Sequence, residues 1–215
     1  MSNVTDQCRD TKKLNKLVQI MLAAALAEIK AKGVNPLVIE TYRTRERQNY
    51  LYGQGRTRAQ CLAAGVPAAY ARPGATQVTW TLNSIHCLKK AVDVIPVRKG
   101  KAIWNAADKD TQTIIEVMEK YGFEPGANWS KSPDSPHFQV KGDFGTAFCQ
   151  GHTTTHVTKT IQRALKTKGF YNGAIDGKWG SATTKAVNAF RKSNKWTRNG
   201  KVGKVGLKRL LKCLW

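Results

Sequence analysis

The sequence predicts an α+β protein: a small antiparallel sheet with flanking helices, followed by a separate small three-helix domain. Two observations carry this prediction. Before residue 145, stretches with apolar residues at helical spacing are interspersed with short runs of strand-forming residues. Beyond residue 155, only helical spacing is found. The length of 215 residues suffices for one ordinary domain and a second, smaller one.

Three helices are expected in the N-terminal part. Residues 11–32 form an amphipathic pattern, and Gly33 follows it as a plausible C-terminal stop. Residues 46–53 also have a helical pattern. A further amphipathic helix is predicted for residues 108–121, which Gly122 would close.

Strands are expected at residues 36–42, 91–96 and 137–140. Residues 61–73 are rich in Ala, Gly and Pro, and they predict an irregular insertion. The strands would form the small sheet between the helices.

The C-terminal domain is predicted to contain three short helices, at residues 156–168, 181–192 and 205–214, with Ser181 as the N-cap of the second. A stretch without apolar periodicity separates them from the first domain. The expected boundaries are 1–145 for the first domain, 146–155 for the linker and 156–215 for the second domain.

The charge is extreme and uneven. The formal net charge is +22, and residues 151–215 hold 15 Lys and Arg against one acidic residue, Asp176. Such a balance implies a polyanionic partner, whether nucleic acid, an anionic membrane surface or a cell-wall polymer. A hydrophobic content of 41% and six Trp argue against disorder.

Cysteine usage and the N-terminus both point to a cytosolic site of synthesis. Five cysteines form no short repeating spacing, which argues against a disulfide framework. Residues 1–10 are polar and have no apolar signal core, and the apolar run 17–29 is too short to span a bilayer. We therefore expect no signal peptide and no transmembrane segment.

Two histidines and a carboxylate predict a metal site. His86 precedes Asp93 by seven residues, and His137 lies far downstream. Two imidazoles and one carboxylate can hold a catalytic zinc ion and leave its fourth position to water. Asp134 could accept the proton of that water.

A lone histidine is more often structural than a metal ligand, but here the signals converge. Asp93 lies within an apolar strand, where an unpaired carboxylate is costly. His137 lies between Pro136 and Phe138 at the start of another strand. We therefore expect His86, Asp93 and His137 to bind one zinc ion.

These motifs carry a clear resemblance to a known family. The pattern Ser84-x-His86-x6-Asp93 followed by Asp134-x-x-His137 resembles the zinc D-alanyl-D-alanine carboxypeptidase and L-alanyl-D-glutamate endopeptidase family, which includes many phage endolysins. The resemblance spans roughly residues 35–140, and it also rests on the stretches 41–44 with Gln48, 51–57 and 121–139.

The resemblance implies a role for each matching residue. His86, Asp93 and His137 would bind zinc, and Asp134 would be the general base. Arg43 would stabilise the developing oxyanion or bind a substrate carboxylate; a surface salt bridge is the alternative. Ser84 and Gln48 would line the substrate site, although packing is the stronger interpretation of Gln48.

One position departs from the family pattern. Lys89 stands where the family usually has Gly, three residues after His86. Gly serves at such positions for a tight turn or a close approach. Lys89 would alter the turn or place a cation at the rim of the cleft, without changing the spacing of the ligands.

The C-terminal part is similar to the three-helix peptidoglycan-binding domain of many wall hydrolases. Ile161-Gln162, Asp176-Gly177 and Trp179-Gly180 belong to this pattern, which continues to Leu211. The resemblance implies binding to glycan strands or stem peptides. The turn glycines and Trp179 are expected to determine the fold rather than to contact ligand.

The function implied is that of a monomeric phage endolysin. It would hydrolyse peptidoglycan stem peptides, above all the L-alanyl-D-glutamate bond, and would leave the host cytoplasm through a holin-type pore. Cleavage at D-alanyl bonds, as a carboxypeptidase or cross-link endopeptidase, is the alternative within the enzyme class. A basic, non-enzymatic binder of wall or nucleic acid is more remote, because no specific nucleic-acid motif is found. Anionic wall polymers and lipopolysaccharide are further candidate partners.

Overall fold

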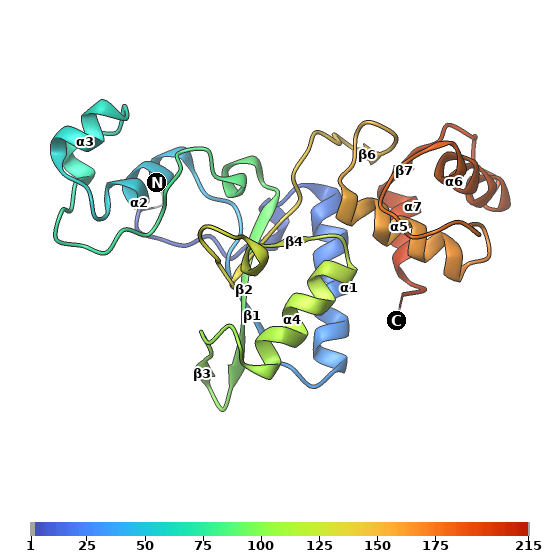
Figure 1. Cartoon of the computed structure of the whole chain (residues 1–215), viewed down its shortest axis with the longest axis horizontal. Helices are drawn as coiled ribbons and strands as arrows, with labels where there is room; N and C mark the ends of the chain where they lie inside the picture. Colours follow the sequence, from blue (N-terminus) through green and yellow to red (C-terminus); the bar gives the residue numbers. More distant parts are fainter. Residues whose placement is uncertain (1–2, 215) are drawn as a thin grey trace.

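A small antiparallel sheet lies at the centre of the N-terminal part, which confirms the α+β class (Figure 1). The computed structural model describes residues 3–214. The strand order is β1-β2-β5-β4, and β3 pairs with the far end of β2. The strands are β1 (Pro36–Glu40), β2 (Ala91–Arg98), β3 (Lys101–Ala102), β4 (Glu124–Pro125) and β5 (His137–Gln139).

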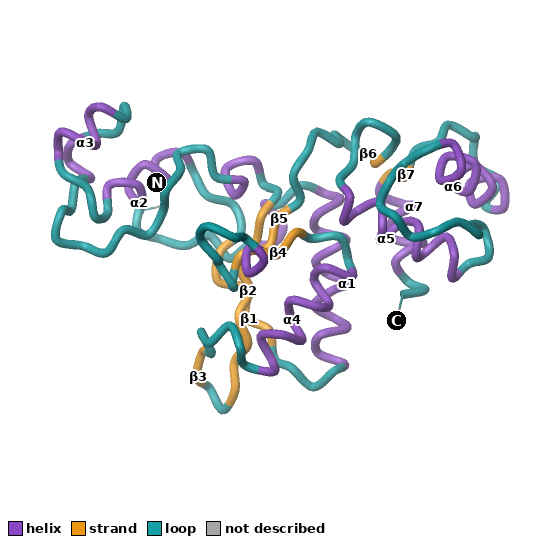
Figure 2. Tube along the Cα trace, viewed as in Figure 1, coloured by secondary structure: helices purple, strands orange, loops and turns teal. Residues whose placement is uncertain are grey.

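Helices flank this sheet. The long helix α1 packs on α4 and on β1, and α4 also contacts β2. Two shorter helices, α2 and α3, lie at the opposite end of the molecule from the C-terminal helices (Figure 2). The helices of this part are α1 (Lys16–Ala31), α2 (Arg45–Gly53), α3 (Arg58–Ala63) and α4 (Lys109–Lys120), with 3₁₀ turns at Thr11–Lys13, Ala68–Tyr70, Ile85–Leu88 and Gly126–Asn128.

The first helix begins later than its apolar pattern predicts. Residues 11–13 form a separate 3₁₀ turn, and α1 starts only at Lys16. The Asn15 side chain accepts a hydrogen bond from Leu17 N at 2.9 Å and caps the helix. An Asn at the N-cap starts a new helix instead of continuing an earlier one, because its side chain accepts a hydrogen bond from a free backbone N–H of the first turn. Gly33 ends the helix region with φ 82°, as expected.

The stretch 61–73 is not wholly irregular, and here the prediction was wrong. Its start completes α3, and a 3₁₀ turn follows at Ala68–Tyr70. Thr57 and Gln60 form a reciprocal capping box that starts α3. Cys61 is fully buried and anchors a small second apolar cluster.

The C-terminal part contains the three expected helices, α5 (Thr155–Thr167), α6 (Ser181–Ser193) and α7 (Lys204–Leu211). Ser181 is the first residue of α6 rather than its N-cap, which is Gly180. The predicted linker contains a strand, β6 (Ala147–Phe148), which pairs with β7 (Val202–Gly203). The domain boundaries themselves remain a prediction.

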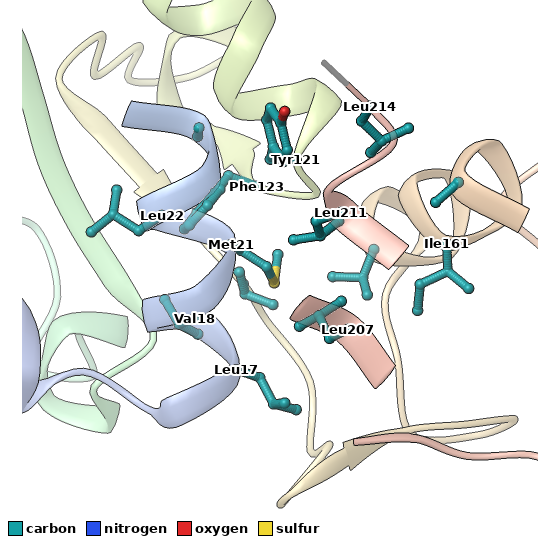
Figure 3. Packing of buried hydrophobic residues seen from close by; sticks show 14 of the residues in the cluster. Leu17, Val18, Met21, Leu22, Tyr121, Phe123, Ile161, Leu207, Leu211 and Leu214 are labelled. Carbon is teal, nitrogen blue, oxygen red and sulfur yellow. The ribbon is translucent and has the colours of Figure 1, made fainter. Parts of the chain in front are cut away.

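One hydrophobic cluster joins the two parts of the chain. Met21 and Leu22 of α1 lie in the same buried cluster as Leu207 and Leu211 of α7 (Figure 3). Helices α1 and α7 are in direct contact. Because apolar side chains from both parts are buried against each other, the C-terminal helices are docked on α1 rather than loosely tethered.

The five cysteines are free thiols in the described residues. Among the helices of residues 3–214, none combines the length and apolarity needed to cross a bilayer.

Candidate metal centre and active site

The register of the sheet lines up two carboxylate side chains and one imidazole. Asp93 of β2 pairs with His137 of β5 on one side and with Glu40 of β1 on the other. Residues directly opposite each other on neighbouring strands project on the same face. The pairing therefore brings together side chains that are up to 97 positions apart in the sequence (Glu40 to His137).

His86 reaches the same point from outside the sheet. It lies in the 3₁₀ turn Ile85–Leu88, whose N-cap is Ser84. The Ser84 hydroxyl accepts a hydrogen bond from His86 N at 3.3 Å, and His86 O accepts one from Arg43 N at 3.4 Å. The His86 side chain is 1% exposed, so the turn holds a buried imidazole in a fixed place.

Three donor atoms converge in this centre. His86 Nε2 lies 3.1 Å from Asp93 Oδ1 and 3.1 Å from His137 Nδ1, and the latter two atoms are 3.2 Å apart. Ligands bound about 2.0–2.2 Å from a tetrahedral zinc ion lie about 3.4 Å from one another. The donor set and its spacing therefore fit a zinc-type centre with three protein ligands.

Contacts behind the two imidazoles bear on which ring nitrogen is free. His86 Nδ1 lies 2.6 Å from Thr41 O, and His137 Nε2 lies 3.3 Å from Gln139 Oε1. Each of these oxygens can accept a hydrogen bond from the ring nitrogen that faces it. In the neutral tautomers with the proton on these nitrogens, the lone pairs of His86 Nε2 and His137 Nδ1 would point into the centre, as metal ligands require.

Asp93 and His137 shift each other's pKa in the centre. Burial alone would raise the pKa of Asp93, but the neighbouring His86 and His137 hold this pKa well below its ordinary value. Burial alone would lower the pKa of His137, yet the hydrogen bond and the charge of Asp93 raise it. The Asp93 carboxylate is therefore ionised at neutral pH.

Asp134 lies at the edge of the centre, three residues before His137. Its carbonyl oxygen accepts a hydrogen bond from His137 N at 3.1 Å, and its amide donates to Gly126 O at 3.0 Å. The residue stays open to solvent, yet surrounding protein atoms raise the pKa of its carboxyl, and the negative charge of Asp93 raises it further. A raised pKa suits a carboxylate that accepts a proton.

Arg43 directs its guanidinium toward the candidate metal centre. Its Nη2 lies 3.8 Å from Asp93 Oδ2 and donates to Glu40 Oε2 at 2.5 Å. Its Nη1 donates to Gln48 Oε1 at 2.9 Å. The carboxyl of Glu40 also accepts from Arg47 Nε at 2.6 Å, and these two cations hold the pKa of Glu40 below its ordinary value despite burial. Arg43 is therefore held by buried partners and does not form a surface salt bridge.

The structure places Gln48 and Ser84 as supports of other residues. Gln48 is fully buried and links Arg43 to Thr79 Oγ1 and Thr81 O. Ser84 is also buried and caps the turn that carries His86. A contact of either residue with substrate remains a prediction.

Several supporting residues were not found from the sequence. Glu40, Thr41 and Gln139 were assigned no role. Gln139 binds Glu124 across the β4–β5 pairing, and Thr41 O faces His86 from beyond the end of β1. The Trp129 ring lies 5.1 Å from that of His137, and its indole donates to Glu124 Oε1 at 3.0 Å. Gln139 Nε2 donates to the same oxygen at 3.1 Å, which extends the network behind His137.

Gly126 is required by a close approach. A Cβ at this position would lie 2.5 Å from Asp134 O and 3.1 Å from His137 Cβ. Gly126→Ala is expected to lower the free energy of unfolding by about 1–3 kcal/mol, because the backbone of the Asp134–His137 turn would have to move. Urea unfolding measures this change. Gly74→Ala is the matched control, since its Cβ would meet no atom within 4 Å; an equal loss in both variants would contradict the steric argument.

Lys89 adopts the left-handed backbone conformation, with φ 61° and ψ 29°. This confirms a tight turn at the position where Gly is usual, and Lys89 Nζ lies 5.2 Å from the Tyr42 ring centroid. Lys89→Gly is expected to be about 0.5–1 kcal/mol more stable than Lys89→Ala, because both variants lose the Tyr42 contact and only Gly relieves the strain. Thermal unfolding of both variants measures the difference. Lys101 lies in a strand and has no positive φ, so Lys101→Gly should be less stable than Lys101→Ala.

Comparisons with known proteins agree with the resemblance seen in the sequence. Residues 77–140 match a family described as D-alanyl-D-alanine carboxypeptidase, and residues 157–210 match a family described as a peptidoglycan binding domain. The first match includes all three candidate ligands and Asp134. Arg43 and Gln48 lie outside it.

Two curated relatives are similar over more than half of the chain. The L-alanyl-D-glutamate peptidase of Listeria phage A118 is 30% identical over 158 residues, which cover 70% of this chain and 48% of the phage protein. The chain thus spans about half the length of that relative. The peptidoglycan L-alanyl-D-glutamate endopeptidase CwlK of Bacillus subtilis is 28% identical over 135 residues, which cover 59% of this chain and 73% of CwlK.

A solved structure, the L-Ala D-Glu endopeptidase ChiX of Serratia marcescens, aligns with a TM-score of 0.43 and 21% identity over 63% of this chain and 89% of ChiX. The family matches fall on the two parts of the chain that the sequence pattern distinguishes. The chain therefore contains one stretch similar to the D-alanyl-D-alanine carboxypeptidase family and a second stretch similar to a peptidoglycan binding domain.

Proposed function

We propose that this protein is a zinc-dependent peptidase that hydrolyses peptidoglycan stem peptides at the L-alanyl-D-glutamate bond. The observation that carries the proposal is the convergence of His86, Asp93 and His137 within 3.1–3.2 Å, next to Asp134, in a chain that also contains a peptidoglycan binding domain. The names of the phage and Bacillus relatives favour this bond.

The residues of the centre divide the chemistry between them. When bound to His86, Asp93 and His137, zinc would polarise the peptide carbonyl and lower the pKa of a water molecule. Asp134 accepts the proton of the attacking water and returns it to the leaving amine. The raised pKa of Asp134 supports both roles. A carboxylate with a raised pKa is a stronger base toward the attacking water, and once protonated it loses its proton to solvent less readily.

Arg43 stabilises negative charge beside the centre. Its guanidinium is held in place by Glu40 and Gln48, so it can face the substrate without reorganising. Either the developing oxyanion or a carboxylate of the substrate would suit its planar donor fork. Ser84 and Gln48 are proposed to border the same substrate site.

The C-terminal domain would hold the enzyme on its polymeric substrate and so raise the local concentration of cleavable bonds. Its excess of basic residues would add attraction to anionic wall polymers or lipopolysaccharide, which salt would weaken. We propose that the protein acts as a monomeric phage endolysin, made in the host cytoplasm and released to the wall through a holin-type pore.

Mass spectrometry of digested sacculi tests the proposed bond. Stem peptides with new N-terminal D-glutamate are the expected product. Release of free D-alanine instead would assign the second candidate, a D-alanyl-D-alanine carboxypeptidase, which the description of the matching family favours. Absence of any cleaved peptide would leave only a non-enzymatic wall binder.

A further inference from the structure

We propose that Trp80 binds the N-acetylmuramyl sugar next to the scissile bond and makes this enzyme prefer glycan-linked stem peptides. The inference rests on the proposed L-alanyl-D-glutamate cleavage. Trp80 is 68% exposed, and its neighbour Val78 is 53% exposed. Neither residue belongs to the metal centre or its supporting network.

An ordered segment presents Trp80 to solvent. The preceding residue, Thr79, is buried, and its carbonyl accepts a hydrogen bond from Arg56 Nη2 at 3.0 Å. Gln48 Nε2 donates to Thr81 O at 2.6 Å on the other side of Trp80. Gln77, with its amide oxygen turned toward the indole, accepts from Trp80 Nε1 at 3.0 Å. These hydrogen bonds hold the backbone on both sides of Trp80, and the bond to Gln77 orients the indole.

The same segment is connected to the catalytic residues. Gln48 donates to Thr79 Oγ1 at 3.3 Å and accepts from Arg43, whose Nη2 lies 3.8 Å from Asp93. Four residues after Trp80, Ser84 caps the turn that holds His86. Trp80 therefore lies between two residues that Gln48 binds, on the segment that leads into the turn of His86.

The chemistry of the substrate explains what this ring would contact. In peptidoglycan, L-alanine is attached to the lactyl group of N-acetylmuramic acid, so a single residue separates the sugar from the L-alanyl-D-glutamate bond. A peptidase that cuts this bond must accommodate the sugar close to its metal. A preordered aromatic ring offers a large apolar face at little entropic cost, and it suits the apolar C–H face of a sugar ring. A peptidase acting at the D-alanyl end would meet no sugar there.

Two substrates separate this role from catalysis itself. One is the peptide L-Ala-γ-D-Glu-diaminopimelate, and the other is the same peptide attached to N-acetylmuramic acid. The wild type is expected to have the higher kcat/KM for the muramyl peptide. Trp80→Ala should lower the ratio of the two kcat/KM values about tenfold, since contacts with the non-reacting part of a substrate contribute to its transition state. Trp80→Phe, which keeps a ring face, should retain most of the ratio.

Trp104→Ala is the matched control, because Trp104 is 62% exposed but lies just after the distant strand β3. In Trp104→Ala, the ratio of the two kcat/KM values should equal that of the wild type. An unchanged ratio in Trp80→Ala, or an equal fall in both variants, overturns the inference while leaving the proposed cleavage intact. If the wild type cuts neither peptide at the L-alanyl-D-glutamate bond, the proposed function itself is wrong, and the sugar-binding role is overturned with it.

Discussion

Asp134→Asn is expected to lower kcat by about 100- to 10,000-fold, the usual contribution of a general base. Asparagine keeps the shape of the side chain but cannot accept the proton of the attacking water. Zinc content should remain at the wild-type level, because Asp134 is not among the three clustered donor atoms. Turnover on purified sacculi and elemental analysis of the same sample measure the two quantities.

Asp143→Asn is the control for this change, because Asp143 is another exposed carboxylate a few residues beyond β5. It should retain full turnover. Loss of zinc in Asp134→Asn would reassign Asp134 as a metal ligand. Retention of both zinc and turnover would remove it from the mechanism.

Removal of the metal is expected to abolish hydrolysis and to lower the melting temperature, and added zinc should restore both. A ligand that binds only the folded state stabilises it by about 4 kcal/mol when its free concentration is 1,000 times its Kd. The stability readout does not depend on activity. Scanning calorimetry with and without zinc, beside a sacculus assay, provides the measurement.

His86→Ala should eliminate the zinc-induced rise in melting temperature, because it removes one of three ligand atoms. His152→Ala is its control: this histidine is exposed and contacts only the backbone of Asp143 through its ring. Full hydrolysis by a preparation shown by elemental analysis to be metal-free would contradict the mechanism. An equal thermal response in the two variants would place the zinc elsewhere.

Local patterns predicted the helices well where one face is apolar. Helix α4 was expected at 108–121 and spans Lys109–Lys120, with Asp108 as its N-cap. The errors lie where a side chain competes with the backbone pattern. Asn15 separates α1 from a 3₁₀ turn, and Thr57 with Gln60 starts a helix next to a stretch rich in Ala, Gly and Pro.

The candidate site was predicted through its residue types and not through its geometry. A carboxylate within an apolar strand and two histidines beside motif residues were enough to select Asp93, His86 and His137. Their convergence could not be derived, because antiparallel register depends on both partner strands and a shift of one residue turns every side chain to the other face. The contact of Gln139 with Glu124 depends on strand register, and that of Thr41 with His86 depends on how a distant turn folds back, so neither support was found.

The sequence by itself determined the fold class, the two family resemblances and the candidate donor residues, because each of these depends on local periodicity or on short motifs. Only the tertiary structure decided that Glu40, Asp93 and His137 align across three strands. It also decided that α7 packs on α1 within one buried cluster. Both results come from contacts between distant segments, which form when apolar surface is buried and which no local pattern records.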